Sequence, residues 1–569
     1  MQRTNHRLLT PYSIFLAGLF LAAVIVRLSG VWGYAYSGDE MLYLIMAQGD
    51  SLAEIWRRGL AELHPPLAHI IRHYLLAFGD SAALQRFFSL CAEMGALAGA
   101  YALGYTLRGR GLALAFVLLM AFMPESVISA GSIRNYAFFM LFALWGMVFY
   151  ARYHMMGQRL CDAAIMAALF FLAGATHFTG FFLVAVCGLC EVILRRRKKQ
   201  YRRLCLYTAL NIPLLLLGLF LYSVYWAPGG TAEMWRELAQ TTGFMEGNNT
   251  EKSLLALFFG QILLPIKGLL LLGETYNISD TVAVFMFLAT LGLAGWYLIG
   301  IWRIVRSKHW FAVWLACLWC VALAVILLGV YPGTSGRHYY FMLPGFLVPL
   351  AWLLQKPIQR LTQTWARSLS VSAGVLIIAG VLFSREAYLA FDADSSLRNE
   401  DLAAGQRFLQ SHVAPGDIVF AGRLAGYYYV LYEMDQGKTP YDLYADVPYF
   451  NGSRIVAPFN PVSKPHRTIE SFYAQLKHEA AASALADTNS VWFVTYSYRN
   501  IEMEKLLDCP EFSQHIDTFF SRQGVMLFSI RAAGLREFLE DTNAWGRCFA
   551  DYKPLIAVDT IPQRARPQP

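Results

Sequence analysis

Two adjacent acidic residues, Asp39 and Glu40, follow the first long apolar segment of the chain. Acidic side chains at a membrane boundary are costly unless they are solvated, paired or bound to a metal. A carboxylate there could act as a general base, and the two together could hold a divalent cation such as Mg²⁺ or Mn²⁺. An ordinary hydrated loop explains an isolated acidic pair equally well.

Cationic residues beside later apolar segments are candidates for binding a phosphate group. Arg134, Arg337 and His338 stand in such positions, and arginine suits phosphate because it is permanently charged and bidentate. Their alternative partners are phospholipid headgroups or acidic loop residues. Lys267 lies in an apolar stretch, where a lone amine is costly without a partner, so it either binds phosphate or snorkels to the interface.

Histidines form a third group of candidates. His64 precedes Pro65-Pro66 and could orient the acidic loop or line a binding site, and His177 lies at an expected loop between two apolar segments. His69 and His73 have the i, i+4 spacing of a metal pair, but the sequence offers no third ligand nearby, which favours a structural role.

The composition defines what must position these residues. The chain has 569 residues, of which 57% are hydrophobic and only 15% charged. Soluble proteins carry about 25% charged residues, and disordered chains lack such hydrophobicity, so both classes are excluded. Many apolar runs reach about 20 residues, the length that crosses a bilayer. No basic arm has the aromatic interleaving expected of a nucleic-acid binder. The composition therefore predicts a multi-pass α-helical membrane protein.

Positive charge predicts the topology of the membrane part. Eleven spans are expected, near residues 11–31, 84–106, 111–127, 135–152, 160–176, 178–194, 205–226, 281–302, 310–330, 339–354 and 368–384. With the N-terminus in the cytoplasm, the Lys/Arg clusters of the loops fall on the cytoplasmic side, as the positive-inside rule requires. Residues 51–63 and 67–78 fit two amphipathic helices lying in the interface.

The stretch 254–273 is apolar but contains Pro265 and Lys267. If it crossed the membrane, the basic loops after it would face outward, against the positive-inside rule. We therefore expect a re-entrant or interfacial segment, and a C-terminus outside the cytoplasm.

The tail differs from the membrane part in charge and pattern. Residues 386–569 hold 17 Lys/Arg and 23 Asp/Glu, a net charge of −6, against +8 for the whole chain. A helix over 400–412, a turn at Ala414–Asp417 and strands at 418–421, 491–496 and 525–530 predict a small α/β domain. Cys509 and Cys548 are the only cysteines there, which suggests one disulfide in an exported domain. We expect two domains, 1–385 and 386–569.

An ordered series of short motifs resembles the GT-C glycosyltransferases that use polyprenyl-phosphate sugars. These include protein O-mannosyltransferase-like, aminoarabinose-transferase-like and lipopolysaccharide galacturonosyltransferase-like enzymes. The series runs through Arg27-Leu28, Asp39-Glu40, His64-Pro65-Pro66-Leu67, Phe78-Gly79-Asp80-Ser81, Arg86 with Ser89, Pro124, Ser129, Arg134-Asn135-Tyr136-Ala137, Thr176-His177 and Gly336-Arg337-His338-Tyr339-Tyr340 with Pro344. No single motif is specific; their order and spacing over residues 20–180 are.

The resemblance implies a GT-C fold of about 11 transmembrane helices and an inverting transfer of one sugar on the outer face of the bacterial inner membrane. Asp39 is then the candidate base, with Glu40 as metal ligand or orienting group. His64, Arg134, Tyr136, His177, Lys267, Arg337 and His338 are then candidates for binding the donor. The acceptor is a glycan, a lipid or a protein, and the tail would lie in the periplasm. Whether a divalent metal takes part stays open.

One departure from the family pattern keeps alternatives open. Relatives commonly carry a second acid just before the Arg-x-Tyr motif, where this chain has Ser132; Glu125 stands seven residues earlier. An inactive relative that binds glycans is therefore one alternative. A glycolipid transporter or flippase is another, but we expect it to show acids and Gly/Pro breaks inside paired spans together with repeat symmetry, and our interpretation of the sequence finds neither.

Overall fold

The computed structural model describes residues 10–28, 31, 38–49, 51–61, 65–157, 159–221, 223, 280–327, 340–382, 399–422, 449–450, 453–456, 473, 476–478, 481, 485–496, 506–522 and 525–548. The chain divides into two compact units. The first comprises Met1–Trp32 and Met46–Ala393, and the second comprises Gly33–Ile45 and Asp394–Pro569.

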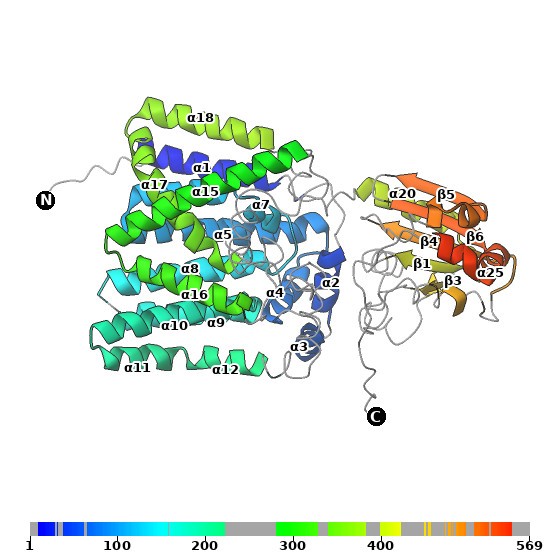
Figure 1. The fold of residues 1–569 in the computed structure, drawn as a ribbon, viewed down its shortest axis with the longest axis horizontal. Coiled ribbons are helices and arrows are strands. Elements are labelled where there is room, and N and C mark those ends of the chain that lie inside the picture. The colour runs from blue at the N-terminus through cyan, green and yellow to red at the C-terminus, as the bar shows by residue number, and fades with distance from the viewer. Residues whose placement is uncertain are drawn as a thin grey trace. The chain divides into compact units, whose positions relative to one another are not determined.

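Long apolar helices lie side by side in the first unit (Figure 1). They are α1 (Pro11–Leu28), α5 (Ala82–Arg108), α8 (Tyr136–Met155), α9 (Leu160–Thr176), α10 (Thr179–Arg197), α15 (Asp280–Arg306), α16 (Phe311–Leu327), α17 (Leu343–Leu361) and α18 (Trp365–Leu382). Two further spans are bent pairs: α6 (Arg110–Ala121) meets α7 (Pro124–Ala130) at 67°, and α11 (Tyr201–Leu210) meets α12 (Ile212–Leu221) at 48°. Each of the eleven predicted spans thus overlaps a helix or a bent pair.

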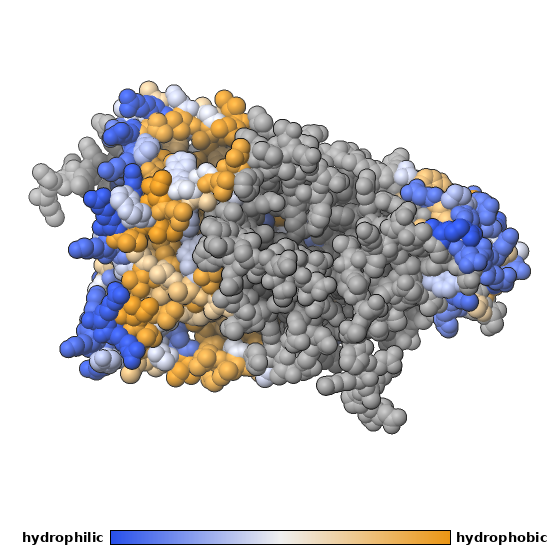
Figure 2. Space-filling view, viewed as in Figure 1, coloured by the Kyte–Doolittle hydropathy of each residue, from blue (hydrophilic) through white to orange (hydrophobic). Residues whose placement is uncertain are grey.

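The apolar character of these helices identifies an integral multi-pass membrane protein. Among the described residues, 5 helices are long and apolar enough to cross a membrane, or up to 7 if each bent pair is one span; α9 and parts of α16 and α18 are shorter apolar helices. Figure 2 shows hydrophobic residues over the helices and hydrophilic residues gathered along one end of the unit. Exposed basic residues stand at helix ends: Arg110 begins α6, and Arg196 and Arg360 lie in the last turns of α10 and α17.

Three short helices precede the second span. They are α2 (Gly38–Ala47), α3 (Leu52–Ala61) and α4 (Leu67–Leu76). The helices α3 and α4 coincide with the two predicted interfacial helices. Within the expected outer connection after the first span, Gly38–Ala47 form a helix, and Asp39 and Glu40 lie in its first turn. Acidic residues are favourable there, since they oppose the positive end of the helix dipole.

A six-stranded mixed sheet forms the core of the second unit, with strand order β2-β3-β1-β4-β6-β5. Its strands are β1 (Ile418–Gly422), β2 (Tyr449–Phe450), β3 (Ser453–Val456), β4 (Ser490–Tyr496), β5 (Ile516–Arg522) and β6 (Val525–Arg531). The strand β1 is parallel to β3 and β4, whereas the pairs β2–β3, β4–β6 and β5–β6 are antiparallel. The helices of this unit are α20 (Asn399–His412), α24 (Pro510–Ser513), α25 (Ala532–Glu540) and α26 (Thr542–Cys548). The predicted small α/β domain is confirmed.

Asp417 fixes the turn between α20 and the sheet. Its carboxylate accepts hydrogen bonds from the Ala414 and Ser490 backbone N–H groups, at 2.9 and 2.7 Å, and from the Trp492 indole at 3.1 Å. Trp492 is buried against Phe408 and belongs to the packing of the domain. Cys509 and Cys548 form the predicted disulfide, which joins α24 to α26.

Candidate active site

Aromatic residues from three separated motifs meet at the end of the first unit where α8 begins. The Tyr136 ring lies 5.1 Å from the His177 ring and 5.8 Å from the Tyr340 ring, measured between centroids. All three residues are buried. The Arg134 guanidinium lies 5.8 Å from the Tyr136 ring, within cation–π range. Of the predicted donor-binding residues, the structure therefore brings together Arg134, Tyr136 and His177.

His177 is held in a defined orientation at the short break between α9 and α10. Its Nδ1 accepts a hydrogen bond from the Thr179 backbone N–H at 3.2 Å and lies 2.7 Å from Thr179 Oγ1. Because a backbone N–H can only donate, Nδ1 must be unprotonated, and the neutral ring carries its proton on Nε2. Asn135 fixes the start of α8 to the same break, since its Nδ2 donates to Thr176 O at 3.2 Å.

A buried polar network lies among α1, α5 and the broken α6–α7 span. Arg27 donates to Ala121 O at 2.7 Å, to Met120 O at 3.0 Å and to Ser126 Oγ at 2.7 Å. Ser126 in turn donates to Glu93 Oε2 at 2.9 Å. The bend between α6 and α7 leaves backbone carbonyls without helical hydrogen bonds. Water would donate to them in a soluble protein, but inside a membrane a protein group must donate instead. Arg27 does so and is fully buried, which gives it a structural role.

Glu93 is the residue of this region that the sequence analysis missed. It is fully buried within α5, and Glu191 is fully buried within α10. The statement that the spans contain no acids is therefore wrong for both residues. Each is compensated inside the protein, Glu93 through Ser126 and Glu191 by Arg195 and His154 at 2.8 and 2.5 Å. The sequence does contain a signal for this buried network: a single acid, Glu93, in one long apolar segment and a single arginine, Arg27, in another.

The broken span also carries Glu125, which we considered as a substitute for the acid missing at Ser132. Glu125 is buried in the first turn of α7, and its backbone oxygen accepts a hydrogen bond from the Tyr340 hydroxyl at 2.5 Å. Ser132 is half-buried in the turn that follows α7. The contact with Tyr340 ties the broken span to the start of α17.

Hydrogen bonds from Arg72 hold α4 against α5. The Arg72 guanidinium donates to Gln85 O at 2.8 Å and to Ser89 Oγ at 3.2 Å. His73 lies one residue further, with Nδ1 3.0 Å from Ala47 O. Because a carbonyl oxygen only accepts, His73 Nδ1 carries a proton there, which leaves Nε2 as the ring nitrogen with a lone pair.

The remaining predicted site residues fall into two groups. Asp39 and Glu40 lie on α2 in the second unit, and the Glu40 side chain is buried. His64, Lys267, Arg337 and His338 lie outside the described residues, as does the whole stretch 254–273.

Comparison with known proteins gives structural matches alone. No family model and no curated protein matches the sequence. ArnT from Cupriavidus metallidurans in the apo state is 12% identical, with 92% of this chain and 98% of that chain covered and a TM-score of 0.47. The same protein bound to undecaprenyl phosphate is 11% identical, with coverages of 91% and 97% and a TM-score of 0.46. The Archaeoglobus fulgidus oligosaccharyltransferase in complex with Zn and sulfate is 13% identical, with coverages of 90% and 72% and a TM-score of 0.46.

Proposed function

We propose that this protein is a membrane glycosyltransferase. It takes one sugar from a polyprenyl-phosphate donor and passes it to a glycan, lipid or protein acceptor on the outer face of the cytoplasmic membrane. The observation that supports this most directly is the contact of Tyr136 with His177 and Tyr340, because it joins three of the motifs on which the family resemblance rests.

The chemistry is a single displacement at the anomeric carbon. The acceptor hydroxyl oxygen forms a bond to that carbon as the bond to the phosphate oxygen breaks, so the configuration inverts. The acceptor proton passes to the Asp39 carboxylate, and the polyprenyl phosphate leaves with the bonding electron pair. A positioned base of this kind contributes about 10²- to 10⁴-fold in rate.

The leaving phosphate needs positive charge and hydrogen-bond donors. Arg134 supplies a guanidinium beside the aromatic cluster, and we assign Arg337, His338 and Lys267 to the same task from the sequence. The His177 proton on Nε2, which follows from the Thr179 contact, makes the ring a donor to a phosphate or sugar oxygen. His64 completes the proposed donor site. Groups held in place before the reaction need no reorganisation, and this electrostatic contribution is usually the largest in catalysis.

Asp39 and Glu40 are consecutive residues of α2, and consecutive positions of an α-helix lie on different faces. We therefore derive no step through a metal. A chelator such as EDTA should leave sugar transfer unchanged in a membrane assay, and a loss restored by Mg²⁺ or Mn²⁺ would contradict this.

The function can be tested in cells by replacing the proposed base. A deletion strain is complemented with the wild-type chain, with Asp39→Asn, or with Glu54→Gln as a control acid on α3. In the deletion strain, mass spectrometry of the envelope glycans and lipids should show one sugar missing from a particular glycan. Wild type and Glu54→Gln should restore it, whereas Asp39→Asn, at equal membrane abundance, should not.

The alternatives give the opposite result. A transporter, or a relative that only binds glycans, needs no base, so Asp39→Asn would restore the glycan fully. That outcome would remove Asp39 from the proposed chemistry.

A further inference from the structure

A cationic cavity lies at the end of the first unit opposite the aromatic cluster, where α5 and α15 end beside α17. Its volume is about 380 Å³, and it is lined by Arg108, Arg303, Arg306, Ser307, Trp352, Gln355 and Lys356. Within α5, Ala92 packs with Ala137 and Phe138 at the start of α8, and the helix ends at Arg108, 16 residues or about 24 Å further along. The cavity is therefore a site distinct from the proposed active site.

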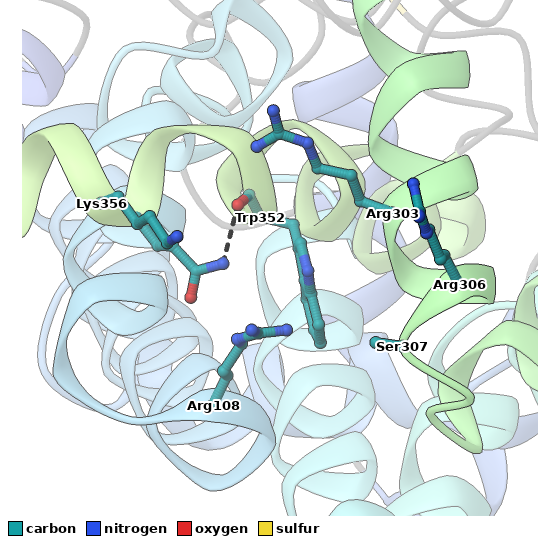
Figure 3. A pocket seen from close by; sticks show the side chains of 7 residues that line it. Arg108, Arg303, Arg306, Ser307, Trp352 and Lys356 are labelled. Carbon is teal, nitrogen blue, oxygen red and sulfur yellow. Dashed lines mark hydrogen bonds between the residues drawn. The ribbon is translucent and has the colours of Figure 1, made fainter.

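The cavity walls combine charge with an aromatic face (Figure 3). The Arg108 guanidinium lies 4.4 Å from the buried Trp352 ring, and Arg306 lies 5.1 Å from the Trp302 ring. Gln355 donates to Trp352 O at 2.8 Å, which fixes its amide in the wall. The stacked Arg108 keeps its outward N–H groups available to a ligand.

The positive charge of the cavity has no counterpart nearby in the chain. The sequence has no acidic residue between Asp280 and Glu386, and none between Glu93 and Glu125, and these two segments supply all of the lining. Within the described part of the chain, neither the three arginines nor Lys356 forms an ion pair with an acid. Four cations thus converge, and none of them is ion-paired with a carboxylate among the described residues.

Helix dipoles do not account for this excess. Basic residues are favourable at helix C-termini, each of which carries about half a negative charge. The ends of α5 and α15 together supply about one negative charge against the four cations, which leaves a surplus of about three. The positive-inside rule explains why basic residues occur at this end, but it does not require them to line one cavity.

We infer that this cavity binds the phosphate of an anionic membrane phospholipid. A volume of about 380 Å³ equals the space of about twelve water molecules, which suits a headgroup rather than a single small ion. The neighbouring surface of α15 is apolar and exposed, with Leu298, Ile299 and Trp302 at 62%, 51% and 55% exposure. Acyl chains can lie along that face while the phosphate enters the cavity. Basic pockets between transmembrane helices are known to recognise such headgroups.

The test uses the full-length protein in neutral detergent, titrated with short-chain phosphatidylglycerol and followed by native mass spectrometry. The paired variant Arg303→Gln/Arg306→Gln removes two cations from the cavity. Arg360→Gln/Arg367→Gln is the matched control, since both arginines are exposed at the same end but do not line the cavity. The cavity variant should weaken lipid binding about 30-fold, and the control should leave it within about twofold.

Two further arms separate the sources of phosphate. Phosphatidylcholine, whose headgroup is neutral overall, should not be retained. Inorganic phosphate should displace phosphatidylglycerol only at far higher concentration, because it has no acyl chains; equal potency would overturn the assignment to a lipid. Equal losses in the two arginine variants would overturn the site itself. If the cavity variant is not monodisperse, Lys356→Gln, with an expected loss of about fivefold, tests the same prediction.

Discussion

Arg27 shows how one side chain stabilises a broken transmembrane span. Replacing it with methionine keeps most of the volume but removes the donors to Met120 O, Ala121 O and Ser126. The buried Glu93 then loses the positive charge of Arg27, to which it is linked by hydrogen bonds through the Ser126 hydroxyl. We expect Arg27→Met to lower the free energy of unfolding by about 3–5 kcal/mol, the cost of leaving a buried charge unpaired. Unfolding of the full-length protein by SDS in mixed micelles measures this.

A double variant separates the lost charge partner from the lost backbone bonds. Glu93→Gln keeps the shape of the side chain and removes its charge, so Arg27→Met/Glu93→Gln should recover part of the stability. If the two losses simply add, Arg27 and Glu93 are not coupled.

Arg134 belongs to the proposed catalytic function rather than to stability. Its side chain is half-buried and its guanidinium lies 5.8 Å from the Tyr136 ring, so the thermal stability of Arg134→Gln is measured beside its activity to separate the two effects. Sugar transfer should fall about 10²- to 10³-fold, the usual cost of removing one stabilising donor. Arg134→Lys keeps the charge but not the bidentate geometry and should give an intermediate rate. Unchanged transfer by Arg134→Gln in membranes would exclude the role.

The buried network illustrates what a sequence does not reveal at this scale. The motif residues Arg27, Arg134, Tyr136 and His177 could be identified because they stand at predicted span ends. Glu93 could not, since hydropathy averaged over a long helix hides one acid, and its partner Ser126 is 33 residues away in another span. Only the packing of α5 against α7 brings them together.

At the scale of elements, hydropathy predicted the spans well and the breaks less well. The bend between α6 and α7 falls at Pro124, which occupies the first position of α7, where its missing N–H costs nothing. The helix α2 was missed because Gly38 and two acids look like a loop. The acids are in fact an N-terminal signal for the apolar residues that follow, and weighing that signal would have predicted a helix there.

The connection between α15 and α16 contains a histidine that should make stability depend on pH. Burial, and then the positive charge of Arg108 and His154, lower the pKa of His309 to about 4. The unfolded chain binds this proton near pH 6.5, whereas the folded chain resists it. The contribution of His309 is therefore complete above about pH 6.5 and is lost as the pH falls toward about 4.

His309→Gln removes this titration. Thermal unfolding of the full-length protein between pH 7 and pH 4 should show a smaller decrease for the variant than for wild type. Parallel curves would mean that the His309 ring is protonated as easily in the folded protein as in the unfolded one.

At the scale of the whole molecule, the disulfide stabilises the second unit. Cys509 and Cys548 are 39 residues apart, and closing such a loop stabilises by about 4 kcal/mol in the chain-entropy description. Arg547 pairs with Glu511 and Asp541 beside it, and these contacts lower the pKa of both carboxyls, but exposed pairs of this kind contribute little stability.

Removal of the disulfide should therefore open the end of this domain. In Cys509→Ser/Cys548→Ser, limited proteolysis of the full-length protein should cut within residues 510–548 much faster than in wild type. Cys161→Ser, which replaces an exposed free cysteine in the first unit, is the control and should leave the cleavage rate unchanged. Equal rates for all three proteins would show that the disulfide does not limit opening.

The charge of the loops predicts the orientation of the whole chain, and reporter fusions can test it. We expect Lys199 and Lys308 on the cytoplasmic side and the C-terminus outside, because the stretch 254–273 does not cross. A fluorescent protein fused after Lys199 or Lys308 should fluoresce, as expected in the cytoplasm. Alkaline phosphatase fused after Pro569 should be active, as expected outside it. If 254–273 crosses, Lys308 moves outside and the C-terminus moves inside. The disulfide weighs against that arrangement, since Cys509 and Cys548 would then lie in a reducing compartment where such bonds are rare.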